Sequence, residues 1–503
     1  MILNDTELRD KVLACWLGKN IGGTLGAPFE WMRRVNDVSF YTQDLGGEPL
    51  PNDDLDIQLL WLIALEERGV EMDAHTLAEY WTLYVTPHWN EYGTAKINMR
   101  AGLMPPLCGV RGNDYKHSCG AYIRSEIWAC IAAGNPHLAA HYALQDAMLD
   151  HGDGEGTYAE VFCAAMESAA FVQNDLRKLL DIGLSFIPES CGVAGATRLA
   201  IECYDKKMTW REARDEMLRQ YRGGTAQSTM AAEDLERGFG DGVLGYDAPD
   251  NIGITVIGLL YGEGDFAQTI CIAVNCGEDT DCTAATAGAL FGIMHGSAAI
   301  PAEWIAPIGR KIKTACLNLG ELGNYGDRLP ATVDELTDRT VKIARLASAR
   351  FSWQTQISSE PTDSSDRSDS YFLGGDAAKK LYERLQGPVY RFDFCDVYLD
   401  YAGDAAIVAG GTKTITAHVF NTGRFQANLQ LRVYAPPGWT VSPQRATLLS
   451  LPGEYPQADG IPFEFTPPTD DALFDRPQHR FVLEITSDGR PTAMTMPILL
   501  LNS

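Results

Sequence analysis

The chain has 503 residues, 45% of them hydrophobic, and 41 basic against 67 acidic side chains give it a formal net charge of −26. This length is enough for two or three domains, and the hydrophobic fraction is normal for a globular protein. Because nucleic acids and anionic membranes are polyanions, the acidic balance argues against both as partners. The first ten residues include acidic side chains and lack the apolar region of a signal peptide, and no apolar run approaches the length of a membrane span. We therefore expect neither a secretory signal nor a membrane-spanning segment.

The cysteines indicate a reducing compartment. There are twelve of them, with no Cys-x-x-Cys pair and no short spacing typical of zinc sites. Most stand in apolar helical contexts, as Cys15, Cys130, Cys163, Cys271 and Cys316 do. We expect buried free thiols, and therefore a cytoplasmic protein.

Apolar side chains recur at helical spacing over residues 5–353, which predicts an almost entirely helical region. Gly18, Gly22 and Gly26 lie on one face of its first helix, and a later helix, residues 284–294, carries alanine and glycine on one face. Such faces let two helices approach closely, which is the expected role of these glycines. They do not form a phosphate loop, because no Gly-Lys-Ser/Thr sequence follows them.

A first acidic cluster, residues 52–56 (Asn-Asp-Asp-Leu-Asp), opens an apolar helix. Asn52 or Asp53 would cap this helix. Asp54 and Asp56 would lie in its first turn, where carboxylates satisfy free N–H groups and the helix dipole. Three acids among four residues exceed what capping needs. We therefore favour a bound cation over a purely structural role.

Aromatic residues between positions 80 and 92 have two interpretations. Most of them fit the core of a helix pair. Trp89 and Tyr92, which stand beside Asn90 and Gly93, could instead stack on a base or a sugar.

Two side chains in the middle of the helical region are candidates for substrate contact. Arg124 could bind an anionic substrate or pair with a neighbouring acid. His151 belongs to a polar glycine-rich loop, residues 151–156, and could line a cleft, although a lone histidine is more often structural. Asp241 and Asp250-Asn251 are weaker candidates for a cleft loop.

A second acidic cluster, residues 278–283 (Glu-Asp-Thr-Asp-Cys-Thr), opens the small-residue helix. A helix cap would explain one of Asp279 and Asp281, but hardly both. Thr283 could add a hydroxyl oxygen, whereas the Cys282 thiol is a poor ligand for a hard cation. Packed carboxylates repel one another, so the two clusters, if they meet, form an all-oxygen cage for a hard divalent metal.

The character of the chain changes after the helical region. Residues 357–370 are rich in Ser, Asp, Thr and Pro without an apolar period, which indicates a linker. After a short helical piece the apolar period becomes two, as in residues 415–419, 429–433 and 481–485, which predicts an immunoglobulin-like β-sandwich. The expected domains are a helical domain (1–353), a linker (354–376) and a β-sandwich domain with a short leading helix (377–503).

Ordered motifs give the helical region a resemblance to a known family. Residues 18–30, Gly-Lys-Asn-Ile-Gly-Gly-Thr-Leu-Gly-Ala-Pro-Phe-Glu, resemble the opening motif of the ADP-ribosylglycohydrolase family, of the dinitrogenase reductase-activating glycohydrolase type. Residues 52–54 look like its Thr-Asp-Asp motif, and residues 277–282 look like its late Gly-Gly-Asp-x-Asp-Thr motif. Residues 120–124 resemble its middle Gly-x-x-Met-Arg segment. The β-sandwich lies outside this resemblance.

The resemblance implies an orthogonal all-helical bundle with a dinuclear magnesium site in a central cleft. It also implies cleavage of an N- or O-glycosidic bond at the anomeric carbon of ADP-ribose. By motif position, Glu30 would lie near the metals for acid–base work or gating, and the metal ligands would be Asp53, Asp54, Asp279 and Asp281. The chain departs from the family pattern at Asn52 and Cys282 in place of threonine ligands, Gly23 in place of an aspartate, and Ser118-Cys119 in place of Gly-Asn.

We therefore predict a metal-dependent glycoside hydrolase that acts on an ADP-ribosyl or related ribosyl substrate. A furanosyl bond breaks through an oxocarbenium-like transition state that nearby negative charge favours. A divalent ion can orient the sugar diol and activate a water, and an unligated carboxylate, Glu30 or Asp56, can take the proton of that water. The predicted site residues are Glu30, Asp54 and Asp279 for catalysis, Arg124, His151 and Asp56 for substrate binding, and Asn52, Asp53, Asp54, Asp279, Asp281 and Thr283 for metal binding.

Two alternatives stay open. The altered motifs also fit a hydrolase of a different furanoside or nucleoside-like glycoside, or a non-catalytic ligand-binding module with a degenerate metal site. The expected cofactor is Mg²⁺, as two ions or one, with Ca²⁺ or Mn²⁺ as alternative ions. The expected partner is a small-molecule glycoside or an ADP-ribosylated substrate, without nucleic acid or membrane, and a homo-oligomer is compatible with the sequence.

Overall fold

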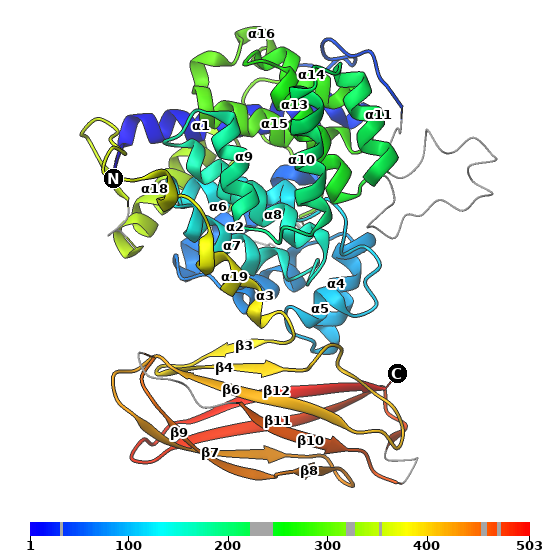
Figure 1. Ribbon diagram of the computed structural model, residues 1–503, viewed down its shortest axis with the longest axis vertical. Helices are drawn as coiled ribbons and strands as arrows, with labels where there is room; N and C mark the ends of the chain where they lie inside the picture. Colours follow the sequence, from blue (N-terminus) through cyan, green and yellow to red (C-terminus); the bar gives the residue numbers. More distant parts are fainter. Residues whose placement is uncertain are drawn as a thin grey trace, which may run out of the picture. The chain divides into compact units, whose positions relative to one another are not determined.

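The computed structural model describes residues 1–30, 34–221, 245–317, 327–351, 355–453, 460–469 and 474–502. The chain divides into two compact units, of which one comprises Met1–Lys96 and Gly112–Tyr382 and the other Ile97–Arg111 and Glu383–Ser503. The first unit is helical and the second consists mainly of strands (Figure 1). The predicted fold classes, helical first and all-β last, are confirmed. The expected boundary at residues 353 and 354 and the candidate Asp241 lie outside the described residues.

The first unit is helical, as the apolar periodicity of its sequence predicts (Figure 1). None of the described helices is long and apolar enough to cross a membrane. The described α-helices are α1 (Asp5–Gly26), α2 (Asp53–Arg68), α3 (Ala74–Tyr84), α4 (Asn90–Ala101), α5 (Leu107–Val110), α6 (Glu126–Ile131), α7 (Pro136–Ala147), α8 (Glu155–Ala170), α9 (Leu176–Ser185), α10 (Gly192–Asp205), α11 (Trp210–Tyr221), α13 (Ala248–Tyr261), α14 (Phe266–Asn275), α15 (Thr280–His295), α16 (Ala302–Ile305), α18 (Val333–Phe351) and α19 (Gly375–Leu381), with the 3-10 turns η1 (Ala27–Phe29) and η2 (Tyr122–Arg124) beside the site.

Helices α1 and α15 approach each other through their glycine faces, as predicted. A Cβ atom at Gly18, Gly22 or Gly26 would overlap a backbone carbonyl group of α15. The contact also runs in the other direction, because a Cβ atom at Gly292 would overlap the carbonyl oxygen of Ala14. At the end of α1 the Thr280 hydroxyl donates a 2.8 Å hydrogen bond to the carbonyl oxygen of Gly26. The start of α15 is thereby held beside the end of α1.

The ends of α2 follow from its sequence. Asn52 is the N-cap, and its side-chain oxygen accepts a 2.6 Å hydrogen bond from the N–H of Asp54. Gly69 ends the helix with φ of 87°, a conformation that residues with a Cβ rarely adopt. Between them the apolar residues of α2 are almost all buried. This helix therefore presents its first turn, with three aspartates, at a defined place in the core.

Part of the expected linker is ordered. Strand β2 (Gln356–Ser358) pairs in parallel with β1 (Ile2–Asn4) at the start of the chain. The N-terminal ammonium group also forms a 2.9 Å ion pair with Asp366. Residues 355–366 are thus attached to the N-terminus of the helical unit.

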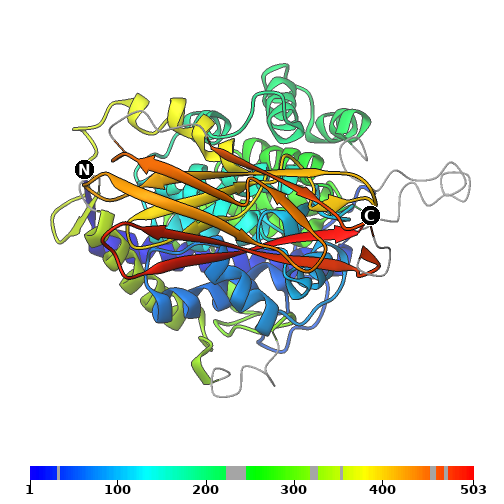
Figure 2. The ribbon, with the colours of Figure 1, turned by 90° about the horizontal axis from the view of Figure 1, so that it is seen from below.

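The β unit contains two five-stranded sheets, drawn from yellow to red in Figures 1 and 2. The alternating apolar residues of β6, β7 and β11 point inward, as predicted. Phe465 on β10 and Phe481 on β11 meet with ring centroids 4.8 Å apart, which joins the two sheets through their buried faces. The immunoglobulin-like assignment stays a prediction. The strand orders are β3 (Val389–Arg391), β4 (Cys395–Asp400), β6 (Lys413–Asn421), β10 (Ile461–Thr466), β8 (Thr440–Ser442) in one sheet and β5 (Ala406–Ile407), β12 (Ala493–Asn502), β11 (Gln478–Ser487), β7 (Ala427–Tyr434), β9 (Arg445–Ser450) in the other.

One segment from the middle of the helical region belongs to the β unit. Residues Ile97–Arg111 cluster with the strands rather than with the helices around them in the sequence. Arg111 forms a 2.6 Å ion pair with Asp404, and Arg480 donates a 3.2 Å hydrogen bond to the carbonyl oxygen of Ala101. These partners are hundreds of residues apart along the chain, so helical periodicity gives no sign of the attachment.

Substituting Gly22→Ala is expected to lower the free energy of unfolding of the helical unit by about 1–3 kcal/mol, the usual cost of overpacking a core. Alanine has the higher helix propensity by about 1 kcal/mol, so a net loss would show that the overlap with Ala284 decides the outcome. Urea unfolding followed by circular dichroism measures it. Gly453→Ala in the β unit is the control for an added methyl group without overlap, because a Cβ atom there meets only the Asn421 oxygen at 3.5 Å, and it should leave the stability of the helical unit unchanged. Equal stability of both variants would contradict the close-packing argument.

Candidate functional site

Both acidic clusters contribute to one pocket of the helical unit. Glu30 follows η1 at the end of α1, Asp53 starts α2, and Asp279 and Cys282 stand at the start of α15. The remaining wall comes from the start of α4, from the segment before η2 and from the segment before α13. The lining residues are Glu30, Asp53, Trp89, Asn90, Glu91, Tyr92, Ser118, Cys119, Gly120, Ile123, Tyr246, Asp279 and Cys282. The two acidic clusters therefore meet in space, which is the condition that the predicted metal site requires.

Two groups of side chains in this region place their ligand atoms close enough to share an ion. One group is Glu30, Asp279 and Asp281, and the other is Asp54, Asp281 and Cys282. Within each group, the candidate ligand atoms lie within 4.8 Å of one another. Asp281 belongs to both groups, so the two positions are adjacent.

Several of these carboxylate oxygens are buried without a hydrogen-bond donor. They are both side-chain oxygens of Asp54 and one oxygen each of Asp279 and Asp281. Asp279 is the N-cap of α15, yet its side chain makes no capping hydrogen bond. The capping explanation therefore does not account for this acid. Buried oxygens that are close together and lack donors fit a divalent cation with oxygen ligands.

The raised pKa values of the pocket carboxyls also indicate a bound cation. Burial, followed by the charges of Asp53 and Asp54, raises the pKa of Glu30 to about 8. Burial, followed by the charge of Asp54, raises the pKa of Asp53 to about 7. Burial and neighbouring carboxylates raise the pKa of Asp279 and of Asp281 well above its usual range. Crowded carboxylates either hold protons or need a cation, and a divalent ion would satisfy several at once.

Lysine 19 supplies part of the compensating charge. Its ammonium group is buried, 2.9 Å from Glu126 and 3.5 Å from Asp54. This places Asp54 between a fixed cation and the shared ligand position. The sequence offered no signal for this role, since Lys19 appears there only as the residue that follows Gly18 in a glycine-rich helix.

Asn52 and Asn251 orient the two clusters. The Asn52 oxygen caps α2, and its amide nitrogen lies 3.4 Å from Asp281. The carbonyl oxygen predicted as a metal ligand thus already accepts a hydrogen bond from its own helix, and its role as a ligand stays a prediction. Asn251 accepts a 3.0 Å hydrogen bond from the N–H of Asp279. Asn251 and Asp250 lie in the first turn of α13 and not in a loop, because the helix starts before them at Ala248, with Pro249 in its first turn.

Two further predicted site residues serve the packing of the helices. Asp56 is fully buried and accepts hydrogen bonds from the N–H groups of Ala315 and Cys316, the latter at 2.6 Å. The hydroxyl of Thr283 donates a 3.3 Å hydrogen bond to the carbonyl oxygen of Thr280 within α15. Neither residue lines the pocket. The predictions of substrate contact for Asp56 and of metal binding for Thr283 therefore receive no support from these contacts.

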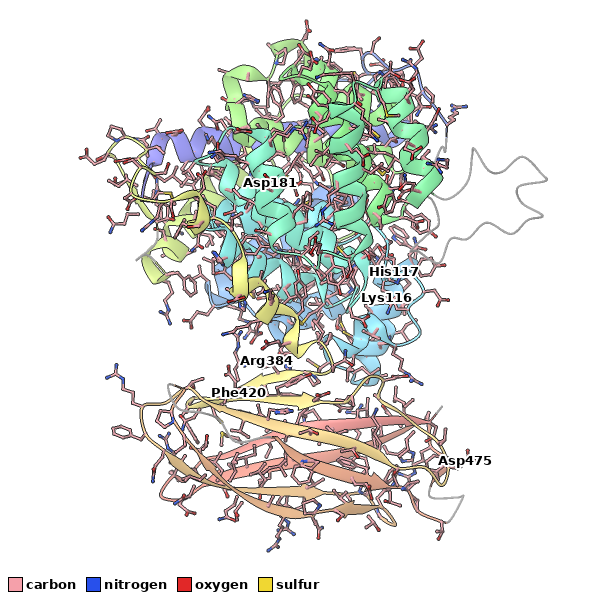
Figure 3. The ribbon with its side chains drawn as sticks, in the orientation of Figure 1. Lys116, His117, Asp181, Arg384, Phe420 and Asp475 are labelled. Carbon is pink, nitrogen blue, oxygen red and sulfur yellow. The ribbon has the colours of Figure 1, made fainter. Side chains whose placement is uncertain are left out.

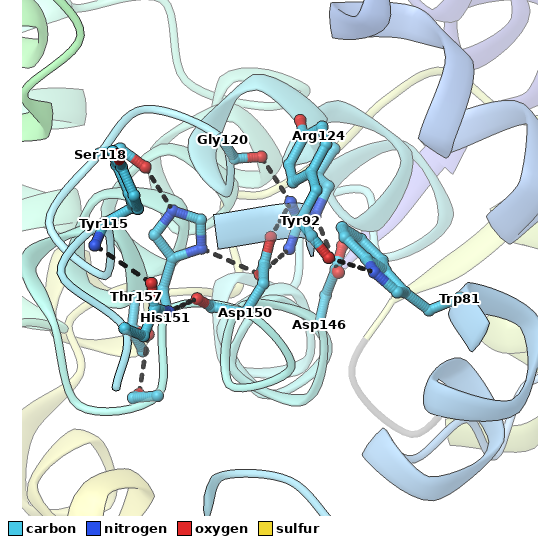
Figure 4. A network of polar contacts seen from close by, with 12 residues as sticks. Trp81, Tyr92, Tyr115, Ser118, Gly120, Arg124, Asp146, Asp150, His151 and Thr157 are labelled. Atoms are coloured by element: carbon cyan, nitrogen blue, oxygen red, sulfur yellow. Dashed lines mark hydrogen bonds and ion pairs between the residues drawn. The ribbon is translucent and has the colours of Figure 1, made fainter. Parts of the chain in front are cut away.

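The guanidinium group of Arg124 is fully buried in a polar network (Figure 4). It forms ion pairs of 2.9 Å with Asp146 and 2.6 Å with Asp150 and lies 5.0 Å from the ring centroid of Trp81. Burial alone would raise the pKa of Asp150, but Arg124 and His151 hold it below its usual range. Of the two interpretations of Arg124, the structure supports the ion pair and not the substrate contact.

His151 connects this network to the pocket wall. Its Nδ1 atom lies 2.9 Å from Asp150, and its Nε2 atom lies 3.2 Å from the hydroxyl of Ser118, which lines the pocket (Figure 4). His151 itself is fully buried. It therefore positions Ser118 and does not reach the substrate directly, which corrects the predicted contact.

The loop that carries Ser118 is attached to the loop before α8. Lys116 forms a 2.8 Å ion pair with Asp153, and the N–H of Glu155 donates a 3.1 Å hydrogen bond to His117 (both loop residues are labelled in Figure 3). The two loops therefore support the same wall of the pocket.

The structure adds pocket residues that the sequence did not single out as site residues. Glu91 is buried, and burial raises its pKa. Cys119 is buried beside Cys282. Trp89, in contrast, is 52% exposed at the pocket, which fits the stacking interpretation, while Tyr92 is buried with its hydroxyl 3.5 Å from Asp53. Glu91 stands in the first turn of a helix, as many other acids do, so its sequence context did not single it out.

A family model identifies the family of the helical region. The family model described as ADP-ribosylglycohydrolase matches residues 4–343. The chain belongs to the ADP-ribosylglycohydrolase family. The search of curated proteins finds no match. Among solved structures, one titled "ADP-ribosylglycohydrolase-related protein complex" is similar at 20% sequence identity, with a TM-score of 0.42, over 68% of this chain and 99% of its own chain.

Membership of the ADP-ribosylglycohydrolase family places the chain among enzymes that are generally hydrolases of ADP-ribosyl substrates. Members of this family generally bind divalent metals, and the acidic groups described above could hold one. The family match includes both acidic clusters and the segment of Ser118, and it ends before the strands of the β unit.

Arg124→Ala is expected to lower the free energy of unfolding by about 3–5 kcal/mol, because Asp146 and Asp150 would stay buried without their cation. Arg68→Ala is the matched control, since Arg68 pairs with Glu79 at the surface and such pairs contribute little. Chemical denaturation measures both variants. A loss in Arg124→Ala as small as in the control would show that the network is not a stabilising element.

Mg²⁺ is expected to raise the melting temperature more at pH 8 than at pH 5. In metal-free protein the pKa values of Glu30 (about 8) and Asp53 (about 7) exceed the value near 4 of unfolded carboxyls. The folded state then holds protons that the unfolded chain has released, so stability is highest below about pH 4 and falls as the pH rises towards 8. A bound cation compensates the ionised carboxylates and so removes this loss of folding stability at high pH. Thermal unfolding with and without chelator tests it, and an equal metal-induced shift at both pH values would contradict it.

Proposed function

We propose that the protein is a metal-dependent glycoside hydrolase that cleaves an N- or O-glycosidic bond of an ADP-ribosyl or related ribosyl substrate. The observation that carries the proposal is the meeting of Glu30, Asp279 and Asp281 within 4.8 Å beside a pocket. Membership of the family supports the reaction class. The buried oxygens without donors support the metal dependence.

The proposed metal ligands are Asp54, Asp279 and Asp281, all nearly fully buried. A bound divalent ion would polarise sugar oxygens and lower the pKa of a coordinated water. Mg²⁺ is the ion implied by the family resemblance, with Mn²⁺ or Ca²⁺ as alternatives. Asp53 belongs to neither ligand group. Its place in the pocket and its raised pKa suit a substrate-side role better than the predicted ligand role.

Glu30 is the proposed general base. It lines the pocket, is only half-buried, and its raised pKa lets it accept a proton near neutral pH. Water attacks the anomeric carbon, the glycosidic bond breaks with its electron pair leaving on the aglycone, and the water proton passes to Glu30. The departing aglycone takes up a proton from solvent. The negative wall around it favours the oxocarbenium-like transition state. The predicted catalytic roles of Asp54 and Asp279 become ligand roles in this proposal, since Asp54 does not line the pocket.

The substrate contacts follow from the wall opposite the acids. Trp89 is exposed enough to stack on a base or sugar. Ser118, held by His151, can hydrogen-bond to a sugar hydroxyl. Because Ser118 and Cys119 stand where the family pattern has Gly-Asn, a different furanoside or nucleoside-like glycoside is the second candidate. We further propose a reducing, cytoplasmic location, which the twelve buried free thiols support.

Hydrolysis of ADP-ribosyl-arginine, ADP-ribosyl-serine and simple furanosides, with and without chelator, tests the proposal. We expect turnover of at least one substrate that chelator abolishes and divalent metal restores. Asp281→Asn should lose bound metal and turnover together. Glu30→Gln should lower kcat about 10²- to 10⁴-fold while bound metal is retained.

Glu303→Gln, an exposed acid on α16, is the matched control and should keep both properties. Turnover of none of these glycosides by metal-loaded protein would overturn the hydrolase proposal. Turnover that Asp281→Asn leaves unchanged would overturn the metal assignment.

A further inference from the structure

We propose that this site selects a sulfur-binding divalent ion, Zn²⁺ above all, through Cys282 and Cys119, in preference to the hard ion Mg²⁺. The inference rests on the proposed metal site and concerns which ion that site takes. It starts from two thiols that lie far apart in the sequence and meet in the pocket.

Cys282 contributes a candidate ligand atom to the shared position. Its sulfur lies within 4.8 Å of carboxylate oxygens of Asp54 and Asp281. Both side-chain oxygens of Asp54 and one of Asp281 are buried without a hydrogen-bond donor. The thiol therefore belongs to a group of candidate metal ligands in which several carboxylate oxygens have no hydrogen-bond donor.

Cys119 supplies a second sulfur at the same place. Its thiol lies beside that of Cys282, and both residues line the pocket. Cys119 belongs to the segment before η2, which His151 and the backbone of Tyr246 hold in position through Ser118 and through the N–H of Cys119. A second sulfur is therefore next to the group of ligand atoms formed by Asp54, Asp281 and Cys282.

The site has fewer oxygen ligands for a hard ion such as Mg²⁺ than the family pattern implies. The Asn52 oxygen, which replaces a threonine of the family pattern, is engaged as the cap of α2. Cys282 replaces the other threonine. Mg²⁺ requires near-octahedral oxygen ligands, whereas Zn²⁺ takes thiolates and carboxylates in a tetrahedral arrangement. Thiolates select zinc-like ions over Mg²⁺ and Ca²⁺.

A second pair of thiols shows that two neighbouring buried sulfurs do not by themselves indicate a metal site. Cys15 and Cys130 are also buried and lie beside each other. Among the described residues, neither of them belongs to a group of convergent ligand atoms. Cys282, in contrast, joins carboxylates of such a group and lines the pocket.

Binding is written as an exchange of protons for metal. The S–H bonds of Cys282 and Cys119 break, metal–sulfur bonds form, and two protons pass to solvent. No oxidant or reductant takes part. The thiols therefore change protonation but not oxidation state.

The experiment uses the full chain, stripped of metal and kept under a reductant that does not bind metal. Dialysis against an equimolar mixture of Mg²⁺, Mn²⁺ and Zn²⁺ is followed by elemental analysis, and we expect Zn²⁺ to be retained. Loading with Co²⁺ should produce a thiolate-to-cobalt charge-transfer absorption, a readout independent of activity.

Cys282→Thr, which restores the residue of the family pattern, should abolish this absorption, lower Zn²⁺ affinity at least about tenfold and favour Mg²⁺ or Mn²⁺. Cys119→Ser should weaken the absorption. Cys130→Ser is the matched control and should leave the absorption and the metal preference unchanged. Circular dichroism establishes that each variant is folded.

Absence of the absorption in the wild-type protein, or an unchanged metal preference in Cys282→Thr, overturns the inference. A Cys119–Cys282 disulfide that persists in reductant also overturns it. Turnover supported by Mg²⁺ without a thiolate signal would leave the hydrolase proposal intact and remove this one. A thiolate signal without turnover of any glycoside would do the reverse.

Discussion

The close approach of α1 and α15 is the contact on which the site depends. Glycines of α1 lie against backbone carbonyl groups of α15, so the two helices come closer than side chains would allow. The hydrogen bond from Thr280 to Gly26 then places the first turn of α15 beside the end of α1. Glu30 follows α1, and Asp279 and Asp281 begin α15, so the same contact that packs the core brings the acids together. Capping of α2 by Asn52, whose amide faces Asp281, adds the first cluster to them.

Charge balance divides the buried acids of the helical unit into two kinds. Asp146 and Asp150 have a fixed cation, Arg124, and form a stable network under the pocket wall. Asp279 and Asp281 have buried oxygens without donors and raised pKa values, so their environment is completed only by protons or a metal. Asp54 lies between the two kinds, because Lys19 lies 3.5 Å away but leaves its oxygens without a hydrogen bond. This difference separates acids that hold the fold from acids available for chemistry.

The pocket wall has its own support, and this support connects the substrate side to the metal side. His151 joins the Arg124 network to Ser118, and the next residue, Cys119, contacts Cys282 at the start of α15. Ser118, Cys119 and Cys282 all depart from the family pattern, and they are neighbours in space. Changes at these positions therefore act on one surface of the pocket.

The sequence by itself determined the features that depend on residues near one another in the chain. These are the helical and strand periods, the glycine faces, the caps Asn52 and Gly69, and the two acidic clusters with their family motifs. It also brought the main site residues into view, since Glu30, Asp54, Asp279 and Asp281 all lie in those motifs. Only the tertiary structure decided which polar groups have partners, because those partners are distant in sequence. It paired Arg124 with Asp146 and Asp150, engaged Asp56 with the backbone at Cys316, brought the Asn52 amide to Asp281, placed residues Ile97–Arg111 in the β unit, and set Cys119 beside Cys282. A carboxylate or a thiol has the same chemistry in every sequence, and its role is set by burial and by the charges that the fold places around it.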